Sequence, residues 1–380
     1  MTGDSVPTRK AAAPRRAPTS AQVAERAGVS RATVSAVLND VKSISIGKET
    51  QRKVWEAARE LGYEPNVAAR NLVSGSSRTV AVLIPRTEHL PFDAFLPQLL
   101  GAINDRCHAY GYKVLLEAAD DHGKLQGAFV NLARGKRIDG LIVANMRASE
   151  RPFVEQLAAE GFPVVVPGNG SEGFHSRGGS FNDVGTAAKV TQHLIDLGHQ
   201  RIAHLAFASE DFESVAMRRT GWERALLAAG LVPDPALLAH ADISALSGYV
   251  AMLKLLSRKQ PFTALFAGND TIAFGAMRAL RESGRRVPED VAVVGYDDIP
   301  LAAYAHPALT TLRVDPLSRG TDAADMLNAL MTGGRYVRLN TEYATQLVVR
   351  ESCGALGAAT LRPAELPSAS TVVVPVKKRR

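Results

Sequence analysis

Apolar positions along the chain change their spacing near residue 78, and this change divides the chain into two parts. Between residues 19 and 63 they recur every three or four positions, as on one face of an α-helix. From Thr79 onward, amphipathic segments alternate with short apolar runs, namely TVAVLIP, YKVLLE, IDGLIVAN, PVVVP, RIAHLAF, TALFAG and DVAVVGYD. Apolar strands that alternate with helices predict parallel sheets covered by helices on both faces. Since roughly 275 residues exceed one comfortable core, we expect two similar subdomains.

The first part predicts three short helices. Thr19 and Gln22 have the spacing of a capping box, and Gly28 can adopt the left-handed conformation that ends a helix. Ser30 is placed to cap a second helix, and a third runs from about residue 48 to residue 61. Two short helices joined by a tight glycine turn and backed by a third match the geometry that places a second helix in the DNA major groove. A small three-helix bundle without DNA is the alternative.

Polar and small residues occupy the outer face of the predicted second helix. Val34, Val37 and Leu38 follow the helical spacing of a buried stripe. The residues expected to face outward are Arg31, Ala32, Ser35, Ala36 and Asn39. Such a face favours contact with DNA.

Basic residues are concentrated at the two ends of the chain. Residues 1–78 hold 13 Lys/Arg and 7 Asp/Glu, whereas the whole 380-residue chain has a net charge of +7. Residues 1–18 predict a flexible basic tail, and residues 354–380 predict a low-complexity basic tail ending in KKRR. A cationic head suggests a polyanionic partner, although a solvated basic surface has the same composition.

Several other classes of protein find little support. No apolar run reaches the roughly 18–20 residues of a membrane span, and residues 1–17 lack the apolar core of a secretory signal. Cys107 and Cys353 lie far apart and give neither a disulfide framework nor a metal-ligand spacing, so we expect a reducing cytoplasm and no metal. Residues 168–173 fit G-x-G-x-x-G, but the following FHSRGGS cannot form the helix that a dinucleotide fingerprint opens. We therefore expect no cofactor and no catalytic site.

Longer motifs resemble the lactose-repressor (LacI/GalR) family of bacterial transcription regulators. They are TSAQVAERAGVSRATVSAVLND, ETQRKVWEAARELGYEPNVAARNLVSG, IDGLIVAN, HLIDLGHQRIAHL, SGY, AGND, RVPEDVAVVGYDD, PALTTLRVD and LVVRES. Together they span roughly residues 19–353 in the family's order. The resemblance implies an N-terminal all-α helix-turn-helix headpiece with a hinge helix. It also implies an α/β body of periplasmic-binding-protein type with two Rossmann-like subdomains.

The resemblance assigns DNA contacts to the headpiece, residues 19–64. Arg31 and Ala32 hold the positions that contact base edges; arginine can pair bidentately with guanine, whereas alanine offers only its methyl group. The family often has an arginine where Ala36 stands, so one usual base contact is missing. Thr33 and Ser35 are expected at phosphates. Within the headpiece, the set expected at DNA is Thr19, Ser30, Arg31, Ala32, Thr33, Ser35, Ala36 and Asn39.

Residues 65–77 match the family's hinge helix and linker. A helix this short is unstable alone, so we expect it to fold when two copies meet on DNA. Asn66, Ala69 and Arg70 are expected to contact DNA there, and Leu72 to enter the minor groove as a wedge that kinks a base step. An interdomain linker whose Leu72 packs on the body is the alternative.

Residues 78–353 are expected to form the effector-binding domain. The resemblance implies chain crossings near 182, 313 and 341, which give an N-subdomain of about 79–182 and 315–340. The C-subdomain then takes about 183–312 and 341–353. The ligand is expected between the two, at the carboxyl ends of strands.

The resemblance also names the residues expected to contact the effector. They are Phe92, Asp93, Asn145, Asn169, Arg218, Asn269 and Asp297. Arginine offers several donors, aspartate accepts hydroxyl protons and asparagine does both, which suits a polyol or glycoside. Asp93 stands where the family has an aromatic residue, and Ile243 where relatives often have one. The pocket is thus expected to be less aromatic than is usual.

These features together predict a homodimeric or tetrameric regulator, a repressor of operator DNA in the bacterial cytoplasm, associated with the nucleoid. Its DNA affinity is expected to respond to a small polar effector, a sugar or sugar derivative. A sugar-binding protein of periplasmic type is the main alternative, but it needs a signal peptide and no basic head. A nicotinamide-dependent enzyme would rest on residues 168–173 alone.

Overall fold

The chain forms two compact units, each with a core of its own. The computed structural model describes residues 18–38, 44–64, 75–84, 90–91, 93–118, 127–167, 183–334 and 343–355. The first unit comprises residues 1–77 and the second residues 78–380.

The described residues of the first unit form three helices, several of whose ends follow from capping residues. They are α1 (Ser20–Ala27), α2 (Arg31–Leu38) and α3 (Lys48–Leu61). The predicted capping box is confirmed, since Gln22 N donates to Thr19 Oγ1 and Thr19 N donates to Gln22 Oε1 at 2.8 Å. Gly28 and Gly62 end α1 and α3 at φ 64° and 63°, where a side chain would be strained. Ser30 Oγ accepts from Thr33 N at 3.0 Å and so caps α2.

Apolar side chains from all three helices form the core of this unit. They include Val23, Val34, Val37, Leu38, Val54, Ala57 and Ala58, with Leu61 packed against them. The expectation that Ala36 faces outward is wrong, because its side chain is only 6% exposed. The side chain of alanine is a single methyl group, which does not extend beyond the atoms around it. A longer side chain at the same helix position could extend past them.

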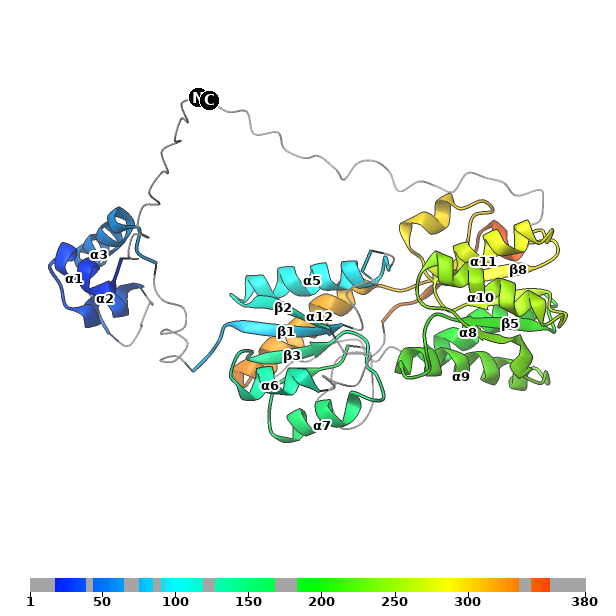
Figure 1. Cartoon of the computed structure of the whole chain (residues 1–380), viewed down its shortest axis with the longest axis horizontal. Coiled ribbons are helices and arrows are strands. Elements are labelled where there is room, and N and C mark those ends of the chain that lie inside the picture. Colours follow the sequence, from blue (N-terminus) through cyan, green and yellow to red (C-terminus); the bar gives the residue numbers. More distant parts are fainter. Residues whose placement is uncertain are drawn as a thin grey trace, which may run out of the picture. The chain divides into compact units, whose positions relative to one another are not determined.

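The described part of the second unit contains two sheets, each covered by helices on both faces (Figure 1). The first sheet has the order β2-β1-β3-β4 and is parallel throughout. Its strands are β1 (Thr79–Ile84), β2 (Lys113–Ala118), β3 (Gly140–Val143) and β4 (Val164–Val165). One face packs against α5 (Leu96–Ala109) and α12 (Pro316–Thr332). The other packs against α6 (Ala128–Arg134) and α7 (Arg151–Ala159).

The second sheet has the order β10-β9-β8-β7-β5-β6, and only β10 is antiparallel to its neighbour. Its strands are β5 (Ile202–Ala206), β6 (Leu238–His240), β7 (Ala264–Ala267), β8 (Ala292–Asp297), β9 (Thr310–Arg313) and β10 (Gln346–Val348). The helices on one face are α8 (Asp183–Asp196) and α9 (Glu213–Ala228). Those on the other are α10 (Ala245–Ser257) and α11 (Asp270–Glu282). Where the structure describes the unit, it also has the 3₁₀ helices η2 (Pro235–Leu237), η3 (Pro300–Tyr304) and η4 (Glu351–Cys353).

The chain passes between the two sheets more than once. After β9 it forms α12, which packs beside α5 on the first sheet, and it then returns to the second sheet as β10 (Figure 1). We call the first sheet with its helices the N-subdomain and the second with its helices the C-subdomain. The crossings expected near 182 and 341 lie outside the described residues.

Candidate functional site

The outer face of α2 carries the residues expected to contact DNA. Arg31, Ala32 and Ser35 are exposed, whereas Thr33 is half-buried and its Oγ1 lies 2.9 Å from Ser30 Oγ. An exposed arginine beside short side chains can approach base edges closely. The expected contacts that lie outside the described residues are Asn39, Asn66, Ala69, Arg70 and Leu72.

A cavity of about 70 Å³ lies between the N- and C-subdomains. The N-subdomain lines it with Asp93, Phe95, Leu96, Ala144, Asn145 and Arg319, and the C-subdomain with Asp183, Phe207, Ser214, Arg218, Ile243, Asn269 and Asp297. Five of the seven residues expected at the effector are therefore brought together. The other two, Phe92 and Asn169, lie outside the described residues.

Arg218 is held in place inside the protein. Its Nε donates to Asp183 Oδ1 at 3.0 Å, and the two side chains are only 10% and 7% exposed. Its guanidinium also donates to the Gly268 carbonyl and lies over the Tyr296 ring, 3.7 Å from the centroid. Burial by itself lowers the pKa of Arg218, but the charges of Tyr296, Asp183 and Asp297 outweigh it and raise the pKa overall. The guanidinium therefore stays charged at the wall of the cavity.

Asp297 ends β8 in an unusual backbone conformation, with φ 116°. Burial raises its pKa well above the usual range, against the opposing effect of Arg218. Nearby Asp270 accepts from Thr311 Oγ1 at 2.6 Å and from Ile299 N at 2.9 Å, yet burial raises its pKa to about 7. A ligand that donates hydrogen bonds or carries positive charge would stabilise the ionised form of such buried carboxyl groups.

Three further predicted residues have structural partners as well as a place in the cavity. Asn269 caps α11 through a bond from Ile272 N at 2.8 Å. Asp93 Oδ1 accepts from Phe95 N and Leu96 N at 2.8 and 3.1 Å, so it supports the start of α5. Asn145 Oδ1 accepts from Ser214 Oγ at 3.0 Å, which joins the two subdomains across the cavity. A ligand at these groups would meet oriented side chains.

More bonds join the subdomains beside the cavity. The segment 146–151, which follows β3, contacts the segment 211–214 at the start of α9. Ser149 Oγ donates to Asp211 Oδ2 at 2.8 Å, and Arg151 donates to Glu213 Oε1 at 2.5 Å. The backbones also bond, from Glu213 N to Met146 O at 3.0 Å. These contacts hold the described arrangement of the two subdomains together.

Two charged residues of the cavity, Asp183 and Arg319, were not predicted from the sequence. Asp183 begins α8 on its buried face, and Arg319 lies four and eight residues before Ala323 and Leu327 in the buried stripe of α12. Arg319 is 9% exposed, donates to Pro167 O at 3.3 Å, and burial lowers its pKa. A charged residue within an apolar stripe is the signal that could have found both.

Comparisons with known proteins identify both parts of the chain. Residues 21–66 match the family "Bacterial regulatory proteins, lacI family", and residues 191–353 match a periplasmic binding protein-like domain. The HTH-type transcriptional regulator CelR of Thermobifida fusca is 35% identical over 345 residues, which cover 89% of this chain and 99% of CelR. This chain belongs to the lacI family. The resemblance and the fold class expected from the sequence are thereby confirmed.

Other lacI-family proteins match over similar lengths. The HTH-type transcriptional repressor PurR of Erwinia tasmaniensis is 35% identical over 87% of this chain and 95% of its own length. A solved lac repressor dimer, bound to operator and an anti-inducer, has a TM-score of 0.73 at 30% identity, over 89% of this chain and 99% of its own. A CelR–cellobiose complex has a TM-score of 0.65 at 32% identity, over 88% and 99%.

Membership in the lacI family makes the chain a helix-turn-helix transcription regulator with a DNA-binding headpiece and a periplasmic-binding-protein-like body. The matched headpiece supports this function over that of a periplasmic sugar-binding protein. In the part of the chain that the structure describes, no helix is both long and apolar enough to span a membrane.

Proposed function

We propose that this regulator binds paired operator half-sites as a homodimer, and that a sugar or sugar derivative in the cavity changes its operator affinity. The observation that carries the proposal is the set of polar groups that both subdomains direct into one cavity. A ligand that contacts both subdomains can favour one arrangement of them over another, which is what allosteric control requires. The cellobiose complex of CelR supports a sugar in a body of this kind.

The chemistry of the cavity suits a molecule rich in hydroxyl groups. The Asp297 carboxyl can accept hydrogen bonds from hydroxyl groups, and the amides of Asn145 and Asn269 can both donate and accept hydrogen bonds. Phe95 and Phe207 add apolar surface. A sugar presents hydroxyl groups at its edge and C–H groups on its faces, so it can use both kinds of surface. Asp183 is already paired with Arg218, so Asp93 is the carboxylate of the lining that favours a hydroxyl-rich or cationic ligand over an anionic one.

Thermal-shift screening of sugars, purines and amino acids tests the effector, followed by titration of operator binding with each hit. We expect a sugar to raise the melting temperature and to change operator affinity. Asp297→Asn should weaken binding of that sugar tenfold or more, whereas Asp290→Asn, outside the cavity in the same subdomain, should not. A hit that is apolar, or that binds Asp297→Asn as well as wild type, would show that the site is assigned wrongly.

The homodimer follows from the need for two headpieces at paired half-sites. Two exposed apolar regions of the second unit support it. Leu115 and Leu116 are 37% and 44% exposed on β2, which lies at the edge of its sheet, and Leu301 and Tyr304 are 63% and 74% exposed on η3. Apolar side chains on an edge strand favour pairing with another chain.

The salt dependence of operator binding tests the role of the headpiece. Neutralising phosphates releases counterions, so we expect affinity to fall about a thousandfold between roughly 50 and 200 mM salt. A protein that begins at Arg78 should not bind DNA under any of these conditions. An affinity that hardly changes with salt, or that survives removal of the headpiece, would contradict the proposal.

A further inference from the structure

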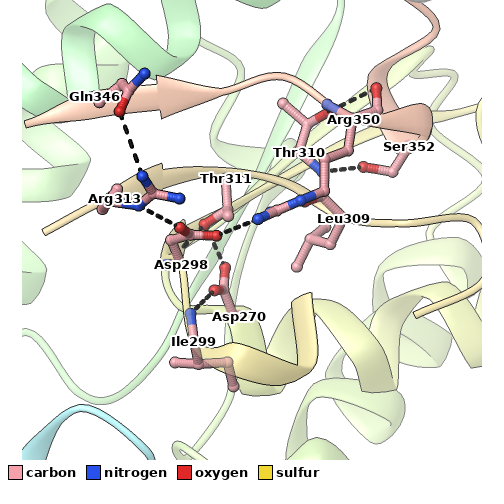
Figure 2. A network of polar contacts seen from close by, with 10 residues as sticks. All are labelled: Asp270, Asp298, Ile299, Leu309, Thr310, Thr311, Arg313, Gln346, Arg350 and Ser352. Carbon is pink, nitrogen blue, oxygen red and sulfur yellow. Dashed lines mark hydrogen bonds and ion pairs between the residues drawn. The ribbon is translucent and has the colours of Figure 1, made fainter. Parts of the chain in front are cut away.

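Asp298 connects the candidate effector site to distant parts of the C-subdomain. It follows Asp297 directly, and its side chain is 5% exposed. Arg313 Nε donates to its Oδ2 at 2.6 Å, and Arg350 donates to its Oδ1 at 2.7 Å. Figure 2 shows this carboxylate between the two guanidinium groups, one from β9 and one from the segment after β10. The loop that carries Asp297 is therefore fixed by residues far along the chain.

Arg313 stands at the point where the chain leaves the C-subdomain. It is the last residue of β9, and α12, which begins at Pro316 three residues later, packs in the N-subdomain. Its Nη1 donates to Gln346 Oε1 at 3.4 Å, and Gln346 is the first residue of β10, where the chain has returned (Figure 2). Arg313, at the end of the outgoing strand, thus contacts both the Asp297–Asp298 loop, which we call the effector loop, and the returning strand.

The backbone of the effector loop is strained. Asp297 and Asp298 have φ angles of 116° and 55°, which residues other than glycine rarely adopt. Such a conformation persists only where its surroundings fix it. Arg313 and Arg350 hold the Asp298 carboxylate, and Asp270 accepts from the amide of Ile299 at 2.9 Å on the other side. A change at Asp297 is therefore transmitted to these partners rather than absorbed by a flexible loop.

We propose that Arg313 is a positioning residue that couples the occupancy of the cavity to the arrangement of the two subdomains. The proposal rests on the proposed function in one respect, namely that a ligand in the cavity contacts Asp297. When that ligand moves the Asp297–Asp298 loop, Arg313 transfers the movement to β9 and β10, which we call the crossover strands. β9 precedes and β10 follows α12 of the N-subdomain, so these strands adjoin two of the chain connections between the subdomains.

Arg313 can be replaced without leaving a buried charge alone. Its side chain is 53% exposed, and Asp298 keeps Arg350 as its partner when Arg313 is removed. Arg313→Met therefore cuts the link to the crossover strands but spares the ion pair inside the protein. Arg286→Met is the matched control, because Arg286 pairs with Asp290 on the surface of the same subdomain and its side chain is 70% exposed.

Spin labels at exposed positions of the two subdomains measure their arrangement directly. Asp105→Cys on α5 and Lys254→Cys on α10 supply the sites, since both residues are exposed and the native Cys107 and Cys353 are buried. In the full chain without ligand, we expect Arg313→Met to broaden the distance distribution or add a second distance. Arg286→Met should leave it unchanged. An unchanged distribution in Arg313→Met overturns the proposal.

Operator affinity gives the second measurement, with a DNA fragment selected by the wild-type protein. Arg313→Met should change this affinity threefold or more, and Arg313→Lys, which keeps the charge beside Asp298, should restore most of it. If the distances change but the affinity does not, the coupling to DNA is refuted. Failure of every sugar in the thermal-shift screen would refute the proposed effector, whereas the distance measurement without ligand would still test Arg313.

Discussion

Replacing Arg218 by Met should lower the free energy of unfolding of the body by about 3–5 kcal/mol, because the substitution leaves the Asp183 carboxylate buried and unpaired. The two side chains are 10% and 7% exposed, so water cannot readily replace the lost partner. The hydrogen bond to Gly268 O and the guanidinium over the Tyr296 ring disappear as well.

The double variant Arg218→Met with Asp183→Asn separates the cost of the unpaired charge from the loss of packing. It removes both charges, while Tyr296 OH, 3.2 Å from Asp183 Oδ1, can still bond at that position. We expect the double variant to lose only about 1–2 kcal/mol, which is the usual effect of neutral hydrogen bonds. The two changes should therefore be strongly non-additive.

Urea unfolding followed by tryptophan fluorescence provides the assay. The chain has two tryptophans, and a Trp55→Phe background leaves Trp222, which is buried in α9, as the probe of the C-subdomain. Arg286→Met, at an exposed pair, should unfold like wild type. Unfolding of Arg218→Met at the wild-type urea concentration, or a double variant as unstable as the single one, would refute the cost of an unpaired Asp183 carboxylate. The result also decides whether a lost effector response in Arg218→Met reflects lost contacts or lost folding.

Three further predictions concern the headpiece, the hinge and a buried histidine. Leu72→Ala should weaken operator binding far more than binding to random DNA, because only a kinked complex uses a wedge; equal losses in competition gel shifts would favour a linker. Arg31→Ala should relax base preference at one position of each half-site by about 1–3 kcal/mol, and an unchanged consensus in DNA selection would contradict this. Burial lowers the pKa of His204 to about 4. The unfolded chain therefore takes up a proton at this histidine near pH 6.5, whereas the folded chain does not. As a result, the free energy of unfolding of the wild type should fall by about 2 kcal/mol through this residue between about pH 7 and 5. His204→Leu should remove that loss in urea unfolding at the two pH values. Asp270, whose pKa is raised to about 7, acts in the opposite direction, so the difference between variant and wild type is the quantity that tests His204.

Local chemistry let the sequence determine the headpiece and the alternation of elements. Thr19, Gln22, Gly28 and Gly62 set helix ends through bonds that span a few residues, and such bonds depend little on the rest of the fold. Strand–helix alternation likewise determined two helix-covered sheets that are parallel except at β10, the antiparallel edge strand of the second sheet. Ala36 marks the limit of this reasoning, because periodicity gives the direction of a side chain but not what covers it.

Only the tertiary structure decided which charged groups meet. Arg218 and Asp183 are 35 residues apart in sequence, and Arg319 enters the cavity from a helix that follows most of the C-subdomain. Asp298 meets Arg313 across the ends of two neighbouring strands. A residue's own sequence neighbourhood carries no information about such partners, because strand order and chain crossings bring them together. Hydrophobic periodicity specifies which face of an element is buried, whereas the pairing of buried charges depends on the topology that stacks those faces.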